Sequence, residues 1–316
     1  MKVSCLWPTG LFAVLLFLLP GGTARADFPV HALAGVSPAV YYGASRPLEK
    51  GFDGKTAVIF IHGWGGGVDT GKIPCDLQDA LDDALVIHPM FPRAEILDKY
   101  GVARDGRAVW NDSWVATNLS KPGRPDDDWR GGGDAVGSRL SSFDVIDTLL
   151  ARLSDRRLFP NLRKVVLTGF SAGGQFVGRY VAVGKGRVGS RIKMVYVAMA
   201  PSTYLLPDDA TIWHYGLKGR PRYSRDLTRD QIMKNLRTRP CLHGCGSADV
   251  LDAALDMTPS AMSQGRNRYL RFLNFQEVVK ADRRWKKMAT FHTFEGIGHQ
   301  AAKAYRDPFY LQYISK

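Results

Sequence analysis

Residues 164–183 read KVVLTGFSAGGQFVGRYVAV, and this stretch decides the fold. It begins with an apolar run typical of a buried strand and ends with a helical pattern. Between them lies GFSAG (169–173), a G-x-S-x-G motif whose glycines permit a sharp strand-to-helix turn. The turn puts Ser171 at a helix N-terminus, where N–H groups stabilise negative charge, so we predict that Ser171 is a nucleophile. A turn without chemistry is the alternative.

A second glycine-rich turn lies upstream, where an apolar run leads into HGWGGG (62–67). Small residues at the carboxyl end of a strand let main-chain N–H groups approach a substrate oxygen. We predict an oxyanion hole made by the N–H of Ala172 with that of Trp64 or Gly65, and we interpret His62 as structural. No Gly-Lys-Ser/Thr follows and the GxGxxG spacing is not met, which disfavours a phosphate cradle.

A serine nucleophile needs a base and an acid, and candidates for both lie further along the chain. His299 is the predicted base, because it comes after the last strand-like run (289–294) and directly after GIG. Asp249 is the predicted acid, since it follows a short strand or loop at 239–245 and gives the chain order Ser, Asp, His. The alternatives for the acid are Asp252, Asp208 and Asp209.

Strand-like and helical patterns alternate along the chain, which is typical of parallel βαβ units. The strand-like runs are 57–61, 84–88, 165–168, 192–199 and 289–294. The helical patterns are 74–85, 142–153, 172–183 and 301–305. We therefore predict an α/β fold with one central sheet flanked by helices.

Two segments, 98–136 and 203–240, fit this alternation poorly. Long excursions in a compact domain are usually lids or mobile insertions. The alternative is that their aromatic side chains fasten each segment to the core. Those aromatic residues are Trp110, Trp114, Trp129, Trp213, Tyr215 and Tyr223.

These motifs resemble the α/β-hydrolase family over residues 57–305. The resemblance depends on HG at 62–63, on the GFSAG turn and on GH at 298–299. It implies an eight-stranded, mostly parallel sheet, and it places the acid after the penultimate strand, where Asp249 lies. APSTY (200–204), WHYGL (213–217) and QGRNR (264–268) are similar to a group of bacterial and fungal hydrolases within the superfamily.

The first 26 residues are predicted to be a signal peptide and residues 27–316 the hydrolase domain. Lys2 precedes an apolar run at 11–19, and ARA at 24–26 is a small-x-small cleavage signature. We expect the mature chain to begin at Asp27 and to be secreted or periplasmic. A permanent membrane anchor is the alternative, although the run is about half as long as a bilayer span.

Three cysteines remain after such cleavage, namely Cys75, Cys241 and Cys245. In an oxidising compartment an odd number implies one disulfide and one free thiol, or an intermolecular bond. We expect Cys241 to pair with Cys245. A zinc site that includes His243 is the alternative, but it offers three ligands where structural zinc sites use four.

Composition excludes several classes of protein. The 316 residues are 45% hydrophobic and 23% charged, which is too apolar for a disordered chain. The net charge is +13, but Lys and Arg are spread along the chain and interleaved with Asp. We interpret this as a basic, solvated surface and predict no nucleic-acid partner.

The resulting hypothesis is a secreted serine hydrolase that cleaves carboxylic esters of small acyl substrates without a metal or other cofactor. Ser at the nucleophile position, where Asp would be needed, disfavours epoxide hydrolase and dehalogenase chemistry. A peptidase or amidase with the same triad is one alternative, and a non-catalytic binding protein on a hydrolase scaffold is another.

Overall fold

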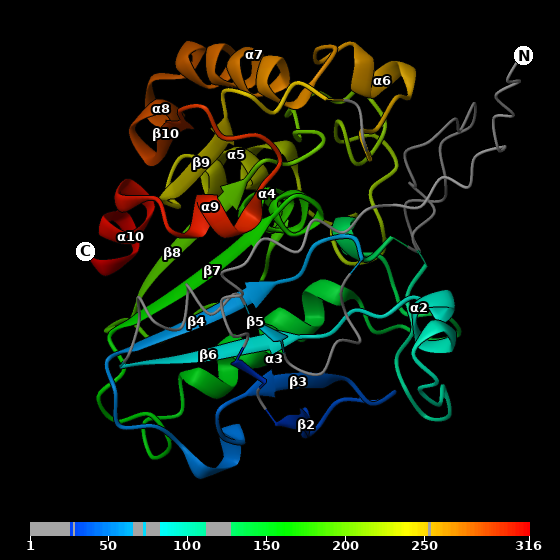
Figure 1. Cartoon of the computed structure of the whole chain (residues 1–316), viewed down its shortest axis with the longest axis vertical. Helices are drawn as coiled ribbons and strands as arrows, with labels where there is room; N and C mark the ends of the chain where they lie inside the picture. The colour runs from blue at the N-terminus through cyan, green and yellow to red at the C-terminus, as the bar shows by residue number, and fades with distance from the viewer. Residues whose placement is uncertain (1–25, 28, 66–71, 74–82, 112–127, 252–253) are drawn as a thin grey trace, which may run out of the picture.

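The computed structural model describes residues 26–27, 29–65, 72–73, 83–111, 128–251 and 254–316, and its main element is one eight-stranded sheet (Figure 1). In spatial order the strands are β10 (Ala289–Phe294), β9 (Cys241–Gly246), β8 (Lys193–Met199), β7 (Lys164–Phe170), β4 (Thr56–Ile61), β6 (Ala84–Pro89), β3 (Tyr41–Ala44) and β2 (Val30–Ala32). A separate antiparallel ribbon pairs β1 (Ala26–Asp27) with β5 (Lys72–Ile73).

The sheet is mostly parallel, as predicted. The strands from β6 across to β10 are parallel to their neighbours, whereas β3 and β2 add an antiparallel edge. All residues of β7 except Lys164 are buried, because β7 lies between β4 and β8 and is covered on both faces. Such double coverage explains why this strand reads as a continuous apolar run in the sequence.

Helices cover both faces of the sheet. Neighbouring residues of a strand point to opposite faces, and Thr168 and Gly169 show what each face meets. The hydroxyl oxygen of Thr168 lies 3.4 Å from that of Tyr310, on a C-terminal helix. A Cβ on Gly169 would lie 2.4 Å from Gly173, in the helix that follows the strand. The molecule therefore has three layers (Figure 1).

The α-helices differ in length and in how they begin. They are α2 (Ala94–Lys99), α3 (Ser142–Leu153), α4 (Ala172–Val183), α5 (Arg229–Leu236), α6 (Pro259–Met262), α7 (Arg268–Ala281), α8 (Arg283–Met288), α9 (Ala301–Tyr305) and α10 (Pro308–Ser315), with 3₁₀ turns η1 (Leu48–Lys50) and η2 (Trp129–Gly131). Ser141 and Asp144 form a reciprocal capping box that begins α3. Phe143 of α3 packs against Phe176 of α4 with ring centroids 4.8 Å apart, so α3 and α4 share one layer.

The predicted helix at 74–85 is mostly outside the described residues, which leave out 74–82, and residues 84–85 belong to β6. The five predicted strands and the helices at 142–153, 172–183 and 301–305 are confirmed. Within the part of the chain that is described, no helix is both long and apolar enough to cross a membrane.

The two long excursions contribute aromatic side chains to the core. Trp110 and Trp129 from the first excursion are fully buried, and Trp114 lies outside the described residues. From the second excursion, Trp213 and Tyr223 are buried in the main core cluster. The side chains thus have the packing role that the sequence analysis left open, and the second excursion also contains α5.

Candidate active site

Ser171 lies at the sharp turn between β7 and α4. Its backbone has φ 59° and ψ −118°, a conformation that L-residues rarely adopt. The turn is tight because small residues let the chain segments approach each other: a Cβ on Gly173 would lie 2.3 Å from the carbonyl oxygen of Ile61. The N–H of Ser171 donates to the carbonyl of Met199 at 2.9 Å, which fixes the turn to β8.

Ser171, His299 and Asp249 are brought together from three separate segments. The Nε2 atom of His299 lies 2.9 Å from the Oγ atom of Ser171, and its Nδ1 atom lies 2.7 Å from Oδ2 of Asp249. An ionised carboxylate only accepts hydrogen bonds, so Nδ1–H donates to Asp249 and Nε2 is left to accept the Ser171 hydroxyl proton. This is the geometry that a nucleophile, a base and an orienting acid require.

The acid and base loops are tied to each other. They follow the parallel neighbours β9 and β10, so both leave the same edge of the sheet. The N–H of Ala248 donates to the carbonyl of Ile297 at 3.0 Å, and the N–H of Gly296 donates to the Ser247 hydroxyl at 2.8 Å. A Cβ on Gly246 would lie 1.9 Å from the Ile297 carbonyl oxygen, so only glycine allows this approach.

Asp249 is buried beside Arg268, the first residue of α7. No part of the Asp249 side chain is exposed, and its Oδ1 atom lies 3.5 Å from Nη1 of Arg268. Arg268 also donates to the carbonyl of Ala254 at 2.7 Å. Burial lowers the pKa of Arg268, which nevertheless stays charged at neutral pH, while Asp249 acts in the opposite direction. The sequence analysis did not find Arg268, since no local pattern links it to an acid 19 positions earlier.

Of the other acids considered from the sequence, Asp208 and Asp209 do not contact His299. The carboxylate of Asp208 is exposed and accepts hydrogen bonds from the N–H groups of Ala210 and Thr211. Asp209 lies 3.6 Å from Arg229. Asp252 lies outside the described residues.

The segment predicted to form the oxyanion hole follows β4, directly beside β7. Ala172 is the first residue of α4, so its N–H has no carbonyl partner within the helix. Trp64 is 41% exposed, with the Arg93 guanidinium 4.4 Å from its ring centroid, and the description of this turn ends at Gly65. Trp64, Gly65 and Ala172 therefore lie at the carboxyl ends of the parallel strands, as Ser171 does.

His62 is buried at the base of that turn and has a structural part, as interpreted. Its Nε2 atom accepts from the N–H of Phe91 at 3.1 Å, and its Nδ1 atom lies 2.7 Å from the Gly63 carbonyl. Burial lowers the pKa of His62 to about 4, so the ring is neutral and Nδ1 donates to Gly63. The side chain thereby fixes the start of the turn.

The expected disulfide is wrong. Cys241 and Cys245 are both free and buried, and both belong to β9. In an extended strand, the Cα atoms of residues four apart are separated by about 13 Å, about twice the longest Cα–Cα distance that a disulfide spans. Among the described residues no group of His, Cys, Asp or Glu could hold a metal ion, so the zinc alternative finds no support either.

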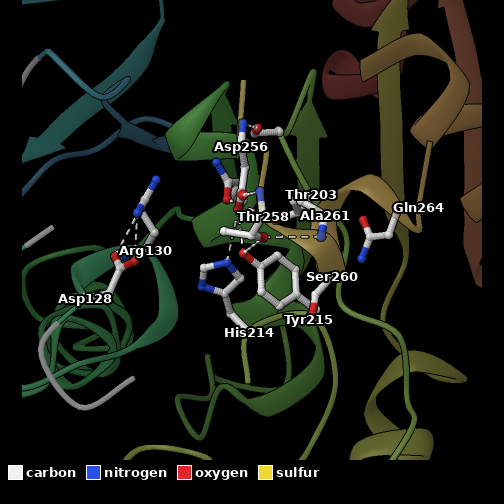
Figure 2. A network of polar contacts seen from close by, with 12 residues as sticks. Asp128, Arg130, Thr203, His214, Tyr215, Asp256, Thr258, Ser260, Ala261 and Gln264 are labelled. Atoms are coloured by element: carbon white, nitrogen blue, oxygen red, sulfur yellow. Dashed lines mark hydrogen bonds and ion pairs between the residues drawn. The ribbon is translucent and has the colours of Figure 1, made fainter. Parts of the chain in front are cut away.

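A buried polar network lies near the site (Figure 2). Tyr215 donates to Oδ2 of Asp256 at 2.7 Å, and the N–H of Asp256 donates to the Ser202 hydroxyl at 2.9 Å. Arg271 donates to the carbonyls of Ser202 and Asp256, at 2.7 and 2.8 Å. These bonds fix the loop between Asp249 and α6 to the segment after β8. His214 of the same network is neutral, because burial lowers its pKa to about 3.

No family model matches the chain, and no curated protein sequence matches it. Among solved structures, poly(aspartic acid) hydrolase-1 from Sphingomonas sp. KT-1 is similar, with 19% identity and a TM-score of 0.62 over 93% of this chain and 100% of that one. LpqC, a poly(3-hydroxybutyrate) depolymerase from Bordetella parapertussis, shares 21% identity with a TM-score of 0.59 over 93% of this chain and 96% of its own. These likenesses show the α/β-hydrolase fold, as the sequence resemblance implied.

Proposed function

We propose that this chain is a serine hydrolase that cleaves carboxylic esters through an acyl-enzyme. Ser171 is the nucleophile, His299 the proton carrier and Asp249 the acid that orients His299. The hydrogen-bonded series from Ser171 through His299 to Asp249, with distances of 2.9 and 2.7 Å, is the observation that carries the proposal.

In the first half of the reaction, the Oγ atom of Ser171 attacks the ester carbonyl while its proton passes to Nε2 of His299. The imidazolium that forms is stabilised by the Asp249 carboxylate, which holds Nδ1. His299 then gives the proton to the departing alcohol oxygen, and the acyl group stays on Ser171. In the second half, water attacks the acyl carbon while its proton passes to Nε2 of His299. His299 then returns the proton to Oγ of Ser171, which releases the acid and restores the enzyme.

The negative charge on the tetrahedral intermediate needs donors that are already in place. The N–H of Ala172 meets this need at the start of α4, where the helix dipole also favours an anion. The turn that His62 fixes is our candidate for the second donor, through Trp64 or Gly65. The strained backbone of Ser171 is consistent with this role, since strain of this kind concentrates at active sites.

The triad alone does not select esters over amides, so the leaving group has to be tested. Esters are proposed because an alkoxide departs more readily than an amine. The two similar proteins described above are named as hydrolases of polymers, poly(aspartic acid) and poly(3-hydroxybutyrate). Both polymers are therefore useful test substrates.

The experiment is a substrate panel for wild-type protein and Ser171→Ala. It contains p-nitrophenyl esters of rising chain length, a peptide library, poly(3-hydroxybutyrate) and poly(aspartate). We expect turnover of esters that Ser171→Ala abolishes. Cleavage of peptides without esters would replace ester hydrolysis with the amidase alternative, and turnover of nothing would favour the binding-protein alternative.

We also propose that the protein is exported and loses residues 1–26. The support is the charged, apolar and small-residue series at the N-terminus. N-terminal sequencing of the exported protein tests this: Asp27 is expected as the first residue, and a retained apolar run at 11–19 would contradict the proposal.

A further inference from the structure

A second cleft lies at the opposite end of α4 from Ser171. α4 begins directly after Ser171 and ends at Val183, about 18 Å along the helix axis. The cleft is lined by Gly184 to Val188, by Met194 and Tyr196 near the start of β8, and by Pro240 before β9. It therefore opens at the amino ends of the strands, whereas Ser171 lies at their carboxyl ends. Its volume is about 700 Å³, within the range of small-molecule sites.

The charged side chains that line this cleft all carry positive charge. They are Lys185, Arg187, Lys234 and Arg239. The uncharged polar lining residues are Tyr196, Gln231, Asn235 and Thr238, and no Asp or Glu belongs to the lining.

Nearby groups offset only part of this charge. Lys185 pairs with Asp226, whose carboxylate lies 2.9 Å from Nζ. Arg239 donates to the carbonyls of Val181 and Gly184, each at 2.8 Å, and so caps the end of α4. Carbonyl groups leave the formal charge of a guanidinium in place. Among the described residues no ion pair to Lys234 or Arg187 occurs. Arg187 donates to the backbone carbonyls of Gly184, Lys185 and Gly186.

A second acid, Asp147, already has several hydrogen-bond donors. The carboxylate of Asp147, in α3, accepts from the hydroxyls of Tyr180 and Tyr223 and from the N–H of Gly186. These bonds occupy the carboxylate beside Gly186, which lines the cleft. Among the described residues, Lys185 is the one lining cation with an ion pair, which leaves an excess of positive charge at the cleft.

Cations continue beyond the cleft. Arg191, three positions after Val188, is exposed, and its pKa is lowered by repulsion from Arg156, then by desolvation, then by repulsion from Arg163. Such clustering of like charges costs free energy that a bound anion offsets. The other cleft walls are apolar and are formed by Leu150, Val188, Met194, Leu227 and Pro240.

We propose that this cleft is a binding site for an organic anion with an apolar body, for example a medium-chain carboxylate. The anionic group contacts Lys234 and Arg187, and the apolar part lies against Met194 and Leu227. The site is separate from the triad, so the proposal stands whether or not the chain hydrolyses esters.

The test measures binding of 1-anilinonaphthalene-8-sulfonate to the full chain by fluorescence titration. Saturable binding is expected, and the double variant Lys234→Glu/Arg187→Glu should bind at least about tenfold more weakly, which corresponds to about 1.4 kcal/mol. The matched control is Lys50→Glu/Lys99→Glu, two exposed cations elsewhere that change the net charge equally. This control should bind within about twofold of wild type, and thermal midpoints check that all three proteins fold.

Two further arms define the ligand. Decanoate should displace the dye, and the uncharged analogue N-phenyl-1-naphthylamine should bind at least about tenfold more weakly than the sulfonate. The proposal is overturned if the double reversal binds the dye as tightly as wild type, or if both dyes bind equally.

Discussion

The carboxylate of Asp249 lies between His299 and Arg268. One oxygen is 2.7 Å from Nδ1 of His299, and the other is 3.5 Å from Nη1 of Arg268. Arg268 is 1% exposed and Asp249 is fully buried, so water does not screen this pair. We therefore predict that Arg268 acts on His299 through Asp249, as a positioning residue.

Replacement of Arg268 should change the pH dependence of hydrolysis. Loss of a positive charge near His299 favours protonated imidazole, so Arg268→Met should raise the pH at which kcat/KM falls to half its plateau by about half a unit to one unit. Arg268→Lys keeps the charge and should leave that pH in place while kcat falls. The measurement is kcat/KM from pH 5 to 9.

Arg271 supplies the control for this prediction. It is a buried arginine on the same helix that bonds to backbone carbonyls and not to Asp249. Arg271→Met should lower the thermal midpoint without a shift of the pH at which kcat/KM falls to half its plateau. If this pH shifts equally in Arg268→Met and Arg271→Met, or shifts in neither, Arg268 is merely structural.

Asp249→Asn should lower kcat by about 10⁴ with little effect on KM, because the amide no longer holds the reactive tautomer of His299. The thermal midpoint should also fall, since Arg268 loses its buried charge partner. Asp208→Asn is the control: its exposed carboxylate bonds only locally, and activity should be unchanged. An active Asp249→Asn would reject Asp249 as the triad acid.

Gly173→Ala should destabilise the fold by about 1–3 kcal/mol, because the new Cβ would lie 2.3 Å from the Ile61 carbonyl oxygen. Gly189→Ala is the matched control, since nothing lies within 4 Å of a Cβ there, and its effect should stay within about 0.5 kcal/mol. Denaturant unfolding measures both. Equal stability of the two variants would mean that the turn at Ser171 is looser than described.

Cys241 and Cys245 should react with iodoacetamide only after the protein is unfolded. No reducing agent should be needed for this reaction, because the two thiols are free. Burial raises the pKa of both thiols and removes them from the reagent. Peptide mapping of protein denatured without reductant should find both residues alkylated. A peptide that carries neither label and is lighter by two hydrogens would restore the disulfide.

The sequence could predict those parts of the site that depend on local backbone geometry. The GFSAG turn between a strand and a helix identifies Ser171, because few sequences tolerate that turn. His299 is found because it lies in the loop after the last strand of a parallel sheet, where chain order implies position. Asp249 needs both chain order and the family resemblance.

Long-range pairing could not be predicted in the same way. Nothing near Asp249 indicates that Arg268 would pack against it, since the contact arises only when α7 docks beside β9. The spacing of Cys241 and Cys245 suggested a closed loop, yet the same residues are extended because β9 pairs with both β8 and β10. The backbone conformation of Cys241 and Cys245 thus depends on pairing with neighbouring strands, which the spacing of two cysteines in the sequence does not reveal.

The most direct measurement is labelling of the protein with a fluorophosphonate, followed by peptide mapping. Only a serine activated by a base and an oxyanion hole reacts quickly, so one adduct is expected, on Ser171. Ser171→Ala should give none, and Ser142→Ala, at a buried serine that begins α3, should label as wild type does. An adduct that persists in Ser171→Ala, or no adduct in wild type, would contradict the account.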